Sequence, residues 1–283
     1  MTTVLRSLTR TIVPRRIRNW LRSPRQTARW ILNAWRPPIA HPVRTDWTLR
    51  CPRNAVERAF HLQSQDPPQI REFDDFVRHL RAAGRVNLLD VGCHFGIFCG
   101  ATLHYGAPGS RVLGVDPSSE ARAMVARIAR LNGWTDRLTF LQAAVGARDG
   151  QIELVETGLT GAGYMVLPRN HPRADRLTLP LRTVDSLAQS LEDPPTLVKI
   201  DVEGLESDVL AGGPLTFGER RTPLFLELHN AMIRERGADP AAVLDRLSAF
   251  GYRTFLIGDQ PCSPPSLLEP PIARFLALHP RTP

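Results

Sequence analysis

The sequence predicts an α/β fold built around a mostly parallel β-sheet with helices on both faces. From about residue 85 onward, short apolar runs rich in Val, Leu and Ile alternate with stretches of helical periodicity, which is the rhythm of strand–helix–strand units. Carboxylates stand where several of these runs end, as expected if parallel strands finish at one edge of a sheet. With 283 residues, the chain suffices for one such domain and an appendage.

The expected elements alternate as far as residue 145: a strand at 86–91, a helix from about 96 to 105, a strand at 111–116, a helix from about 118 to 132 and a strand at 138–145. Ser118 is expected to cap the second of these helices, and Gly133 to end it. A charged helical pattern at 55–83 precedes them and predicts a helical lead-in.

The second half continues with elements of both kinds: a short antiparallel strand at 151–155, strands at 196–201 and 223–229, a helix near 240–250, a strand at 252–257 and a last apolar run at 274–278. The loop from 156 to 175 contains a glycine-rich stretch and carries no readable signature. It is nevertheless expected to frame a substrate. We find no internal repeat.

The net charge of +8 is unevenly distributed along the chain. Residues 1–53 hold twelve Arg and one acid, a balance of +11, whereas the remainder carries −3. Enzymes that act on nucleic acids usually line their cleft with Lys and Arg. The mildly acidic main part therefore argues against a nucleic-acid substrate.

The composition predicts a basic helical N-terminal arm at 1–53, a helical lead-in at 54–84 and one catalytic domain at 85–283. Four of the five Trp lie in the arm among the Arg residues. Such segments lie in anionic membrane interfaces, dock on partner proteins, or are solvated tails whose aromatic side chains pack on the domain, and these interpretations stay open here.

The chain shows no apolar run of the ~20 residues needed to span a bilayer and no secretory signal. The four Cys form no CxxC pair, so a disulfide or zinc framework is not expected. A cytoplasmic protein is predicted, with peripheral contact at the inner face of the membrane as one interpretation of the arm.

The segment from Val86 to Asp116 predicts a site for an adenosine cofactor. An apolar run ends in Asp90, and Gly92 and Gly96 then allow a sharp turn into a helix. Asp116 ends the next strand, where a carboxylate can accept both hydroxyl protons of a ribose. A dinucleotide site wants GxGxxG, which is absent here. Asp90 would repel a pyrophosphate but suits the ammonium and sulfonium groups of S-adenosylmethionine.

Polar side chains gather at the expected strand ends, where ligands of open parallel sheets bind. These residues are Asp90, Asp116, Gln142, Asp201, Glu203, Glu227 and His229. Strand interiors are apolar, so the polar ends are difficult to explain as solvated surface.

Lys199 is the only lysine among 36 basic residues. Unless it stands there by chance, the position needs a compact ammonium or a titratable amine, roles that a guanidinium cannot fill. Lys199 and Asp201 are two residues apart on one strand and point to the same side. The pair could orient a substrate hydroxyl, or Lys199 could lose its proton and act as a base.

His229 has the pKa range needed to take a proton from a hydroxyl during methyl transfer. Glu227, two residues earlier, could hold the imidazole or share a metal ion with Asp201. A Glu-x-His pair is too common to name a metal, and no metal is assigned to the site.

Several motifs resemble the FkbM family of S-adenosylmethionine-dependent methyltransferases over about residues 85–280. The most specific are Val198-Lys-Ile-Asp-Val-Glu-Gly-Leu-Glu206 and Leu226-Glu-Leu-His229, with Asp90-Val-Gly92, Gly114-Val-Asp116-Pro and Ala144-Val-Gly146. Cys93-His94 stands where such proteins usually have Ala-Asn. The resemblance implies a Rossmann-like class I methyltransferase fold with a seven-stranded sheet, and transfer to oxygen of a sugar, polyketide, peptide or glycolipid hydroxyl.

The strand ends and the resemblance together assign roles to the candidate residues. Asp90 and the turn from Gly92 to Gly96 would hold the methionine moiety, Asp116 the ribose, and Gln142 with Ala143 the adenine edge. Lys199, Asp201 and His229 would face a small-molecule or glycan acceptor. A nicotinamide-dependent oxidoreductase and a catalytically silent membrane-associated binding protein remain the alternatives.

Overall fold

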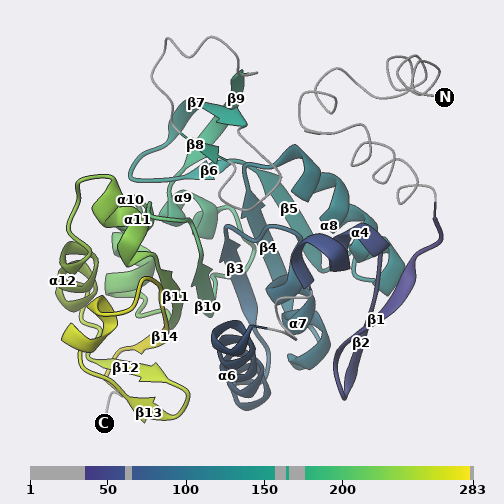
Figure 1. The fold of residues 1–283 in the computed structure, drawn as a ribbon, viewed down its shortest axis with the longest axis horizontal. Helices are drawn as coiled ribbons and strands as arrows, with labels where there is room; N and C mark the ends of the chain where they lie inside the picture. Colours follow the sequence, from purple (N-terminus) through teal and green to yellow (C-terminus); the bar gives the residue numbers. More distant parts are fainter. Residues whose placement is uncertain (1–35, 61–65, 157–163, 166–175, 281–283) are drawn as a thin grey trace.

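The computed structural model describes residues 36–60, 66–156, 164–165 and 176–280, and its centre is one large mixed sheet (Figure 1). The strands of this sheet are β3 Asn87–Val91, β4 Arg111–Asp116, β5 Leu138–Gln142, β10 Leu197–Ile200, β11 Leu224–Leu228, β12 Thr254–Ile257, β13 Gln260–Pro261 and β14 Ala273–Leu278. Their order is β13-β12-β14-β11-β10-β3-β4-β5. The five neighbours from β11 to β5 run parallel, and β14 is antiparallel to both β11 and β12. The expected seven strands are confirmed, with the two-residue β13 added at the edge.

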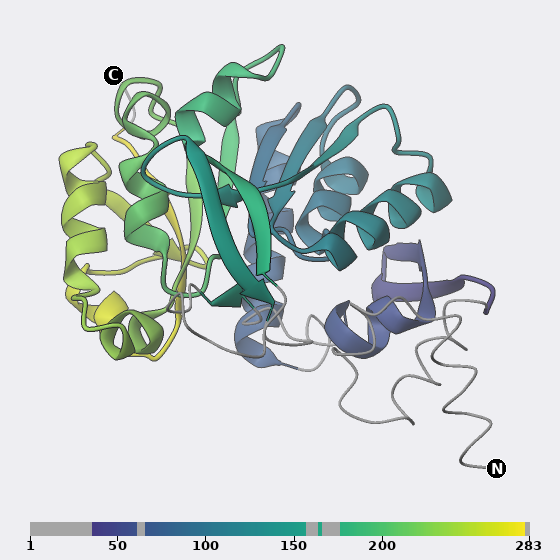
Figure 2. The same cartoon turned by 90° about the horizontal axis from the view of Figure 1, so that it is seen from above.

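Helices cover both faces of the sheet (Figure 2). One face packs against α6 Pro67–Ala83, α7 Ile97–Tyr105 and α8 Ser119–Asn132; the other packs against α9 Val184–Gln189, α10 Glu206–Ala211, α11 Asn230–Glu235 and α12 Ala241–Ala249. Consecutive strand residues serve opposite faces: Leu88 belongs to the first apolar cluster and Leu89 to the second. A parallel sheet buried on both sides needs such uninterrupted apolar strands.

The expected ends of α8 are confirmed. The Ser118 hydroxyl accepts a hydrogen bond from the Ala121 amide at 3.1 Å, and Gly133 ends the helix in the left-handed conformation. This firm boundary fixes where the helix starts relative to Asp116, the last residue of β4.

A second, four-stranded sheet stands over the carboxyl end of the large sheet (Figure 1). Its order is β6-β9-β7-β8, from β6 Ala144–Val145, β7 Gly150–Glu156, β8 Tyr164–Met165 and β9 Arg176–Arg182. The strand expected at 138–145 is therefore two strands, because the chain leaves β4 after Gln142 and pairs with β9 from Ala144. The antiparallel strand expected at 151–155 is confirmed as β7. The glycine-rich stretch at 158–163 and most of the loop around it lie outside the described residues.

The described part of the N-terminal arm is not helical as expected. Residues 39–51 form an antiparallel hairpin of β1 Ile39–Arg44 and β2 Trp47–Cys51. Every second residue of β2 is buried, and Trp47 stacks on Phe73 with ring centroids 6.2 Å apart. Here the aromatic side chain packs on the domain, one of the interpretations left open. Residues 1–35 lie outside the described part of the chain.

The described part of the lead-in is helical as expected, in α4 Arg53–Ala55, the turn η1 Val56–Phe60 and α6, whereas residues 61–65 lie outside the described part. Phe76 of α6 lies with its ring centroid 5.0 Å from those of both Phe98 in α7 and Phe225 in β11. The helix thus shares its core with the domain that follows. Two further short helical turns complete the chain, η3 Leu215–Glu219 and η4 Pro265–Leu268.

All four cysteines are free thiols. Among the residues described by the structure, no helix combines the length and apolarity needed to cross a bilayer.

Candidate active site

The turn after β3 is shaped by packing between protein segments. Gly92 has φ +84°, and a Cβ at this position would lie 1.8 Å from the backbone oxygen of Asp201. The turn is therefore pressed against the chain leaving β10. Gly96 precedes α7 with φ +77°, and its Cβ would meet Val125 of α8 at 3.3 Å. Both glycines thus have structural causes in addition to any contact with a ligand.

The amide groups of this turn are already engaged. The Val115 carbonyl accepts from the N–H groups of Gly92 at 2.8 Å and Cys93 at 3.2 Å, and the Gly96 N–H donates to the Cys93 carbonyl at 2.7 Å. The His94 N–H donates to Asp116 Oδ2 at 2.9 Å. A pyrophosphate needs several free N–H donors at such a turn. These amides therefore disfavour a dinucleotide at this turn.

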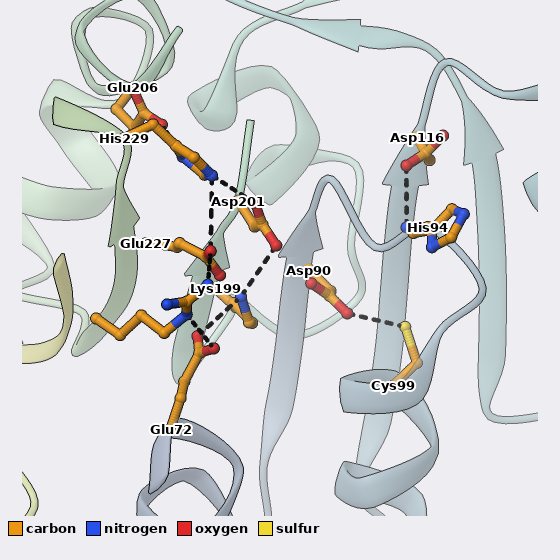
Figure 3. A network of polar contacts seen from close by, with 11 residues as sticks. Glu72, Asp90, His94, Cys99, Asp116, Lys199, Asp201, Glu206, Glu227 and His229 are labelled. Atoms are coloured by element: carbon orange, nitrogen blue, oxygen red, sulfur yellow. Dashed lines mark hydrogen bonds and ion pairs between the residues drawn. The ribbon is translucent and has the colours of Figure 1, made fainter. Parts of the chain in front are cut away.

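Asp90 is buried inside the sheet, with 1% of its surface exposed. Its carboxylate accepts a hydrogen bond from Cys99 Sγ at 3.2 Å (Figure 3). Burial raises the pKa of Asp90 to about 6, although the positive charge of Lys199 opposes this. In this arrangement the Asp90 carboxylate is shielded from solvent.

Asp116 uses both carboxylate oxygens on the backbone, since Oδ1 accepts from the Ser118 N–H at 2.8 Å and Oδ2 from the His94 N–H. Burial raises its pKa to about 6. Each oxygen retains a lone pair, so the carboxylate can still accept from a ribose hydroxyl.

At the end of β5, the Gln142 amide donates to the Pro117 carbonyl at 3.1 Å. Ala143 is buried, and its side chain belongs to the apolar core. Only the backbone of Ala143 is therefore suited to contact an adenine.

Lys199 and Asp201 are brought together as expected, with Nζ 3.8 Å from Oδ2 of Asp201. Lys199 is 1% exposed and also lies 3.2 Å from Oε1 of Glu72 and 4.3 Å above the Phe98 ring. Burial alone would lower the pKa of Lys199, but the carboxylates of Glu72 and Asp201 outweigh burial and raise it. The ammonium form is thus favoured over a neutral amine.

His229 lies between three carboxyl groups (Figure 3). Nδ1 is 2.8 Å from Oε1 of the fully buried Glu206, and Nε2 lies 3.7 Å from Asp201 and 3.6 Å from Glu227. Burial would lower the pKa of His229, but the Glu206 hydrogen bond and the charge of Asp201 raise it above 6.5. The carboxylate that holds the ring is Glu206, whereas Glu227 faces the other ring nitrogen.

Three charged residues of this cluster were not singled out from the sequence: Glu72, Glu206 and Arg274. Glu72 on α6 bridges Lys199 and Arg274, with Oε2 3.3 Å from Arg274 Nε, and Arg274 in turn pairs with Glu227. Glu206 is the last residue of the motif from Val198 to Glu206, but its spacing gave no sign that it faces His229. For Glu72 and Arg274 the sequence held no signal at all.

Asp201, Glu227 and His229 offer ligand atoms that all lie within 4.8 Å of one another. Two carboxylates and an imidazole suit several divalent metals. However, Oε1 of Glu227 is already bonded to the Arg274 guanidinium, which competes with a metal for that oxygen.

Buried acids outnumber buried cations where the strand ends meet. Burial raises the pKa of Glu203 to about 7 and that of Glu227 to about 8, besides the effects on Asp90 and Asp116. Burial is the largest cause in each case, and the positive charges of Lys199 and Arg274 offset only part of it at Asp90 and Glu227. The donor set therefore fits a cationic ligand, such as one carrying a sulfonium and an ammonium group.

Comparison with known protein families decides the class. The profile of the methyltransferase FkbM domain matches residues 90–254, more than half of the chain. This chain belongs to the FkbM methyltransferase family. The FkbM family is S-adenosylmethionine-dependent, and the class I methyltransferase fold follows from the sheet described above.

The FkbM chain is 26% identical over 210 residues to the 2-O-methyltransferase NoeI of Sinorhizobium fredii, covering 64% of this chain and 84% of NoeI. Among solved structures it is similar to a methyltransferase FkbM from Methylobacillus flagellatus, with 16% identity and a TM-score of 0.44. That match covers 69% of this chain and 44% of the other, so this chain spans less than half of that protein. An O-methyltransferase from Bacillus cereus in complex with SAH matches with 12% identity, a TM-score of 0.40 and coverage of 97% and 96%.

Membership in the FkbM family favours the methyltransferase over the two alternatives, an oxidoreductase and a silent binding protein. The hydrogen bonds within the turn after β3 agree with this choice, because the N–H groups of Gly92, Cys93, His94 and Gly96 already have protein partners.

Proposed function

We propose that this FkbM protein is an O-methyltransferase acting on a hydroxyl of a sugar, a glycolipid or a secondary metabolite. The observation that carries the proposal is the orientation of His229: Glu206 engages Nδ1, so Nε2 is directed toward Asp201 and Glu227. An imidazole fixed in this way can accept a hydroxyl proton. The likeness to a 2-O-methyltransferase supports oxygen as the acceptor atom.

In this account, S-adenosylmethionine supplies an activated methyl group on a cationic sulfur. The protein must bring the acceptor oxygen in line with that methyl and remove the hydroxyl proton. The proton passes to Nε2 of His229, and Glu206 stabilises the resulting imidazolium through Nδ1. The Asp201 side chain is 33% exposed while its neighbours are buried, so the acceptor is expected to enter from the side of Asp201.

Lys199 orients the acceptor side and does not act as the base. Its pKa is raised by Glu72 and Asp201 against the effect of burial, so it keeps its proton at neutral pH. A fixed ammonium can hold Asp201 in place, and Asp201 can then accept a hydrogen bond from the acceptor hydroxyl or a neighbouring one.

On the cofactor side we propose Asp90, the backbone from Gly92 to Gly96, Asp116, Gln142 and the backbone of Ala143. Asp116→Ala should weaken binding of S-adenosylmethionine by about tenfold or more, since it removes the acceptor for two ribose hydroxyls. Lys199→Ala should slow transfer and leave cofactor binding nearly intact. Calorimetric titration with S-adenosylmethionine, with NADH as a control ligand, measures cofactor binding by the two variants. Equal loss of binding in the two variants would show that the acceptor side is misassigned.

The transfer is proposed to need no metal, because the Arg274 guanidinium occupies the Glu227 oxygen that a metal would take. Activity should stay within about twofold after dialysis against EDTA. A loss that Mg²⁺ or Mn²⁺ restores would instead assign Asp201, Glu227 and His229 as ligands.

The acceptor atom is tested with methyl-labelled S-adenosylmethionine and three acceptor groups: methyl glycosides and glycolipids, primary amines, and carboxylic acids. The expected product is an alkali-stable methyl ether on a glycoside or another alcohol. Label in an amine or in an alkali-labile ester would contradict transfer to a hydroxyl.

The arm is proposed to make peripheral contact with anionic membrane from the cytoplasmic side. Because Trp47 is part of the core, the suitable deletion is 1–35, which leaves the hairpin in place. The full chain should bind phosphatidylglycerol vesicles more tightly than the deletion variant does, and it should not bind phosphatidylcholine vesicles. Equal binding of both proteins to anionic vesicles would remove this role from the arm.

A further inference from the structure

Two charged residues of the acceptor side, one buried and one mostly buried, lie outside the segment that matches the FkbM family. That segment covers residues 90–254, whereas Glu72 belongs to α6 and Arg274 to β14. Glu72 reaches Lys199 from one end of the chain (Figure 3), and Arg274 reaches Glu227 from the other.

Glu72 is placed between two cations. One carboxylate oxygen lies 3.2 Å from Lys199 Nζ and the other 3.3 Å from Arg274 Nε, and the Glu72 side chain is 5% exposed. Arg274 pairs with Glu227, and Lys199 with Asp201. Glu72 is thus linked through one cation to each of the two carboxylates that face Nε2 of His229.

Stability alone does not account for this arrangement. Replacing a buried ion network with apolar side chains of similar volume often leaves a protein equally or more stable. Around Lys199, the Phe73, Phe76 and Phe98 rings already provide an apolar surface on α6 and α7. The chain uses arginine at every other basic position, yet it has a lysine in this apolar surface. A lysine here is explained if its ammonium group is needed to hold the Asp201 carboxylate in place.

We propose that Glu72 and Arg274 are positioning residues for methyl transfer. Glu72 holds the Lys199 ammonium against Asp201 and the Arg274 guanidinium against Glu227. The lead-in helix α6 and the C-terminal strand β14 are then parts of the catalytic unit. This inference rests on the proposed acceptor side, while its first test below does not require an acceptor.

The first test uses the single lysine of the chain as a probe. Untagged protein labelled with ¹⁵N at the lysine side chain gives one side-chain NMR signal, that of Lys199. Glu72→Gln should shift this signal and speed its hydrogen exchange, because the ammonium loses its nearest carboxylate. The matched control is Asp74→Asn on the same helix, where the half-exposed Asp74 pairs with Arg44. Its spectrum should equal that of the wild type. A Glu72→Gln spectrum identical to wild type would overturn the inference whatever the acceptor is.

The second test uses the best acceptor from the labelled panel. Glu72→Gln and Arg274→Gln should each lower kcat by about 10- to 100-fold, with the dissociation constant of S-adenosylmethionine close to that of the wild type. The melting temperature should fall, because each variant leaves a buried charge without its partner, so kcat is measured well below it. Asp74→Asn should keep the wild-type kcat. A joint fall of kcat, cofactor affinity and melting temperature in Glu72→Gln would indicate a merely structural ion pair and overturn the inference.

A double-mutant cycle tests whether the two residues act together. The losses of kcat caused by Glu72→Gln and by Arg274→Gln should be strongly non-additive in the double variant, because both substitutions disturb the position of the Glu227 carboxylate. Additive effects would overturn the connection between them. If Glu72→Gln fails to fold, the double variant Glu72→Met, Lys199→Met is used instead, because it removes one charge of each sign. This variant should fold and bind S-adenosylmethionine but transfer the methyl group poorly. Methyl transfer at the wild-type rate by this variant would refute the proposal.

Methyl transfer by the wild type distinguishes failure of the proposed function from failure of the positioning role of Glu72. If the wild type transfers to no acceptor in the panel while the Lys199 signal responds to Glu72→Gln, the proposed function fails and the positioning contact stands. If the wild type transfers and Glu72→Gln matches it in kcat, the positioning role fails alone.

Discussion

At the residue scale, the contact between Glu206 and His229 predicts a pH dependence. The Glu206 hydrogen bond and the charge of Asp201 raise the pKa of His229 above 6.5, against burial. His229 can accept a proton only when neutral, so transfer should increase as pH rises through this raised pKa. Glu206→Gln removes the carboxylate that raises the pKa of His229, so the rise should move to lower pH. Its maximum rate should fall by about 10- to 100-fold because the ring loses its orientation.

The pH–rate profile of wild type and Glu206→Gln measures this effect. Asp208→Asn is the control, since Asp208 lies exposed on the same helix and its loss should change neither the profile nor the maximum. An unchanged inflection in Glu206→Gln would show that His229 does not set the profile.

Gly92 gives a second prediction for a single residue. Gly92→Ala places a Cβ 1.8 Å from the Asp201 backbone oxygen, so it should destabilise the protein by about 3 kcal/mol or more. Gly133→Ala is the matched control: φ is also positive, but no atom lies within 4 Å of the added Cβ. It should cost only about 1–2 kcal/mol of backbone strain. Similar losses in urea unfolding would contradict the role of the close contact.

The acids at the strand ends could be expected from the sequence because each ends an apolar run, as Asp116 ends β4. The partners that orient them could not. Glu72 is 127 positions from Lys199 in the chain, and only packing of α6 against the sheet brings them together. Glu206 is part of a motif quoted from the sequence, but it begins a helix of only six residues. Such a short helix has too little periodicity to show which of its side chains points into the protein.

At the scale of elements, the lead-in helix α6 is predicted to stabilise the whole domain. Phe76 is fully buried between Phe98 and Phe225, so Phe76→Ala should cost about 3–5 kcal/mol. Ile70→Ala on the same helix removes a partly exposed side chain and should cost about 1 kcal/mol or less. Calorimetric unfolding should show one transition lowered in Phe76→Ala. A separate early transition for α6 would mean that it folds apart from the sheet.

Two elements differ from those expected from the sequence, and the reasons differ. The hairpin of β1 and β2 buries only alternate residues, and the interspersed Arg and Thr of β2 resembled a basic arm. The run from 138 to 145 is continuous in sequence, yet its two ends pair with different sheets. The strands that pair with the two ends of this run, β4 and β9, are remote from it in sequence, so local periodicity does not reveal the change of sheet.

At the scale of the whole molecule, the excess of buried acids predicts how stability changes with pH. Burial raises the pKa values of Asp90 and Asp116 to about 6, of Glu203 to about 7 and of Glu227 to about 8. An acid with a raised folded-state pKa contributes stability below its unfolded pKa and loses it as pH rises through the folded value. The ligand-free protein should therefore lose stability between about pH 4 and pH 8.

The melting temperature across this range measures the loss. Glu227→Gln should flatten the decline between about pH 7 and pH 8, because the variant has no carboxyl to ionise there. The exposed Glu219 provides the control Glu219→Gln, which should keep the wild-type slope. A wild-type melting temperature that rises steadily over this range would contradict the charge balance described for the site.

His229 is proposed to take the hydroxyl proton during methyl transfer from S-adenosylmethionine. The most direct measurement pairs calorimetric titration with labelled-methyl transfer on the same preparations of wild type and His229→Gln. If His229 is the base, the two cofactor dissociation constants should lie within about threefold of each other, and transfer to an alcohol should be reduced by about 100-fold or more in the variant. Undiminished transfer by His229→Gln, or loss of cofactor binding together with transfer, would contradict this role.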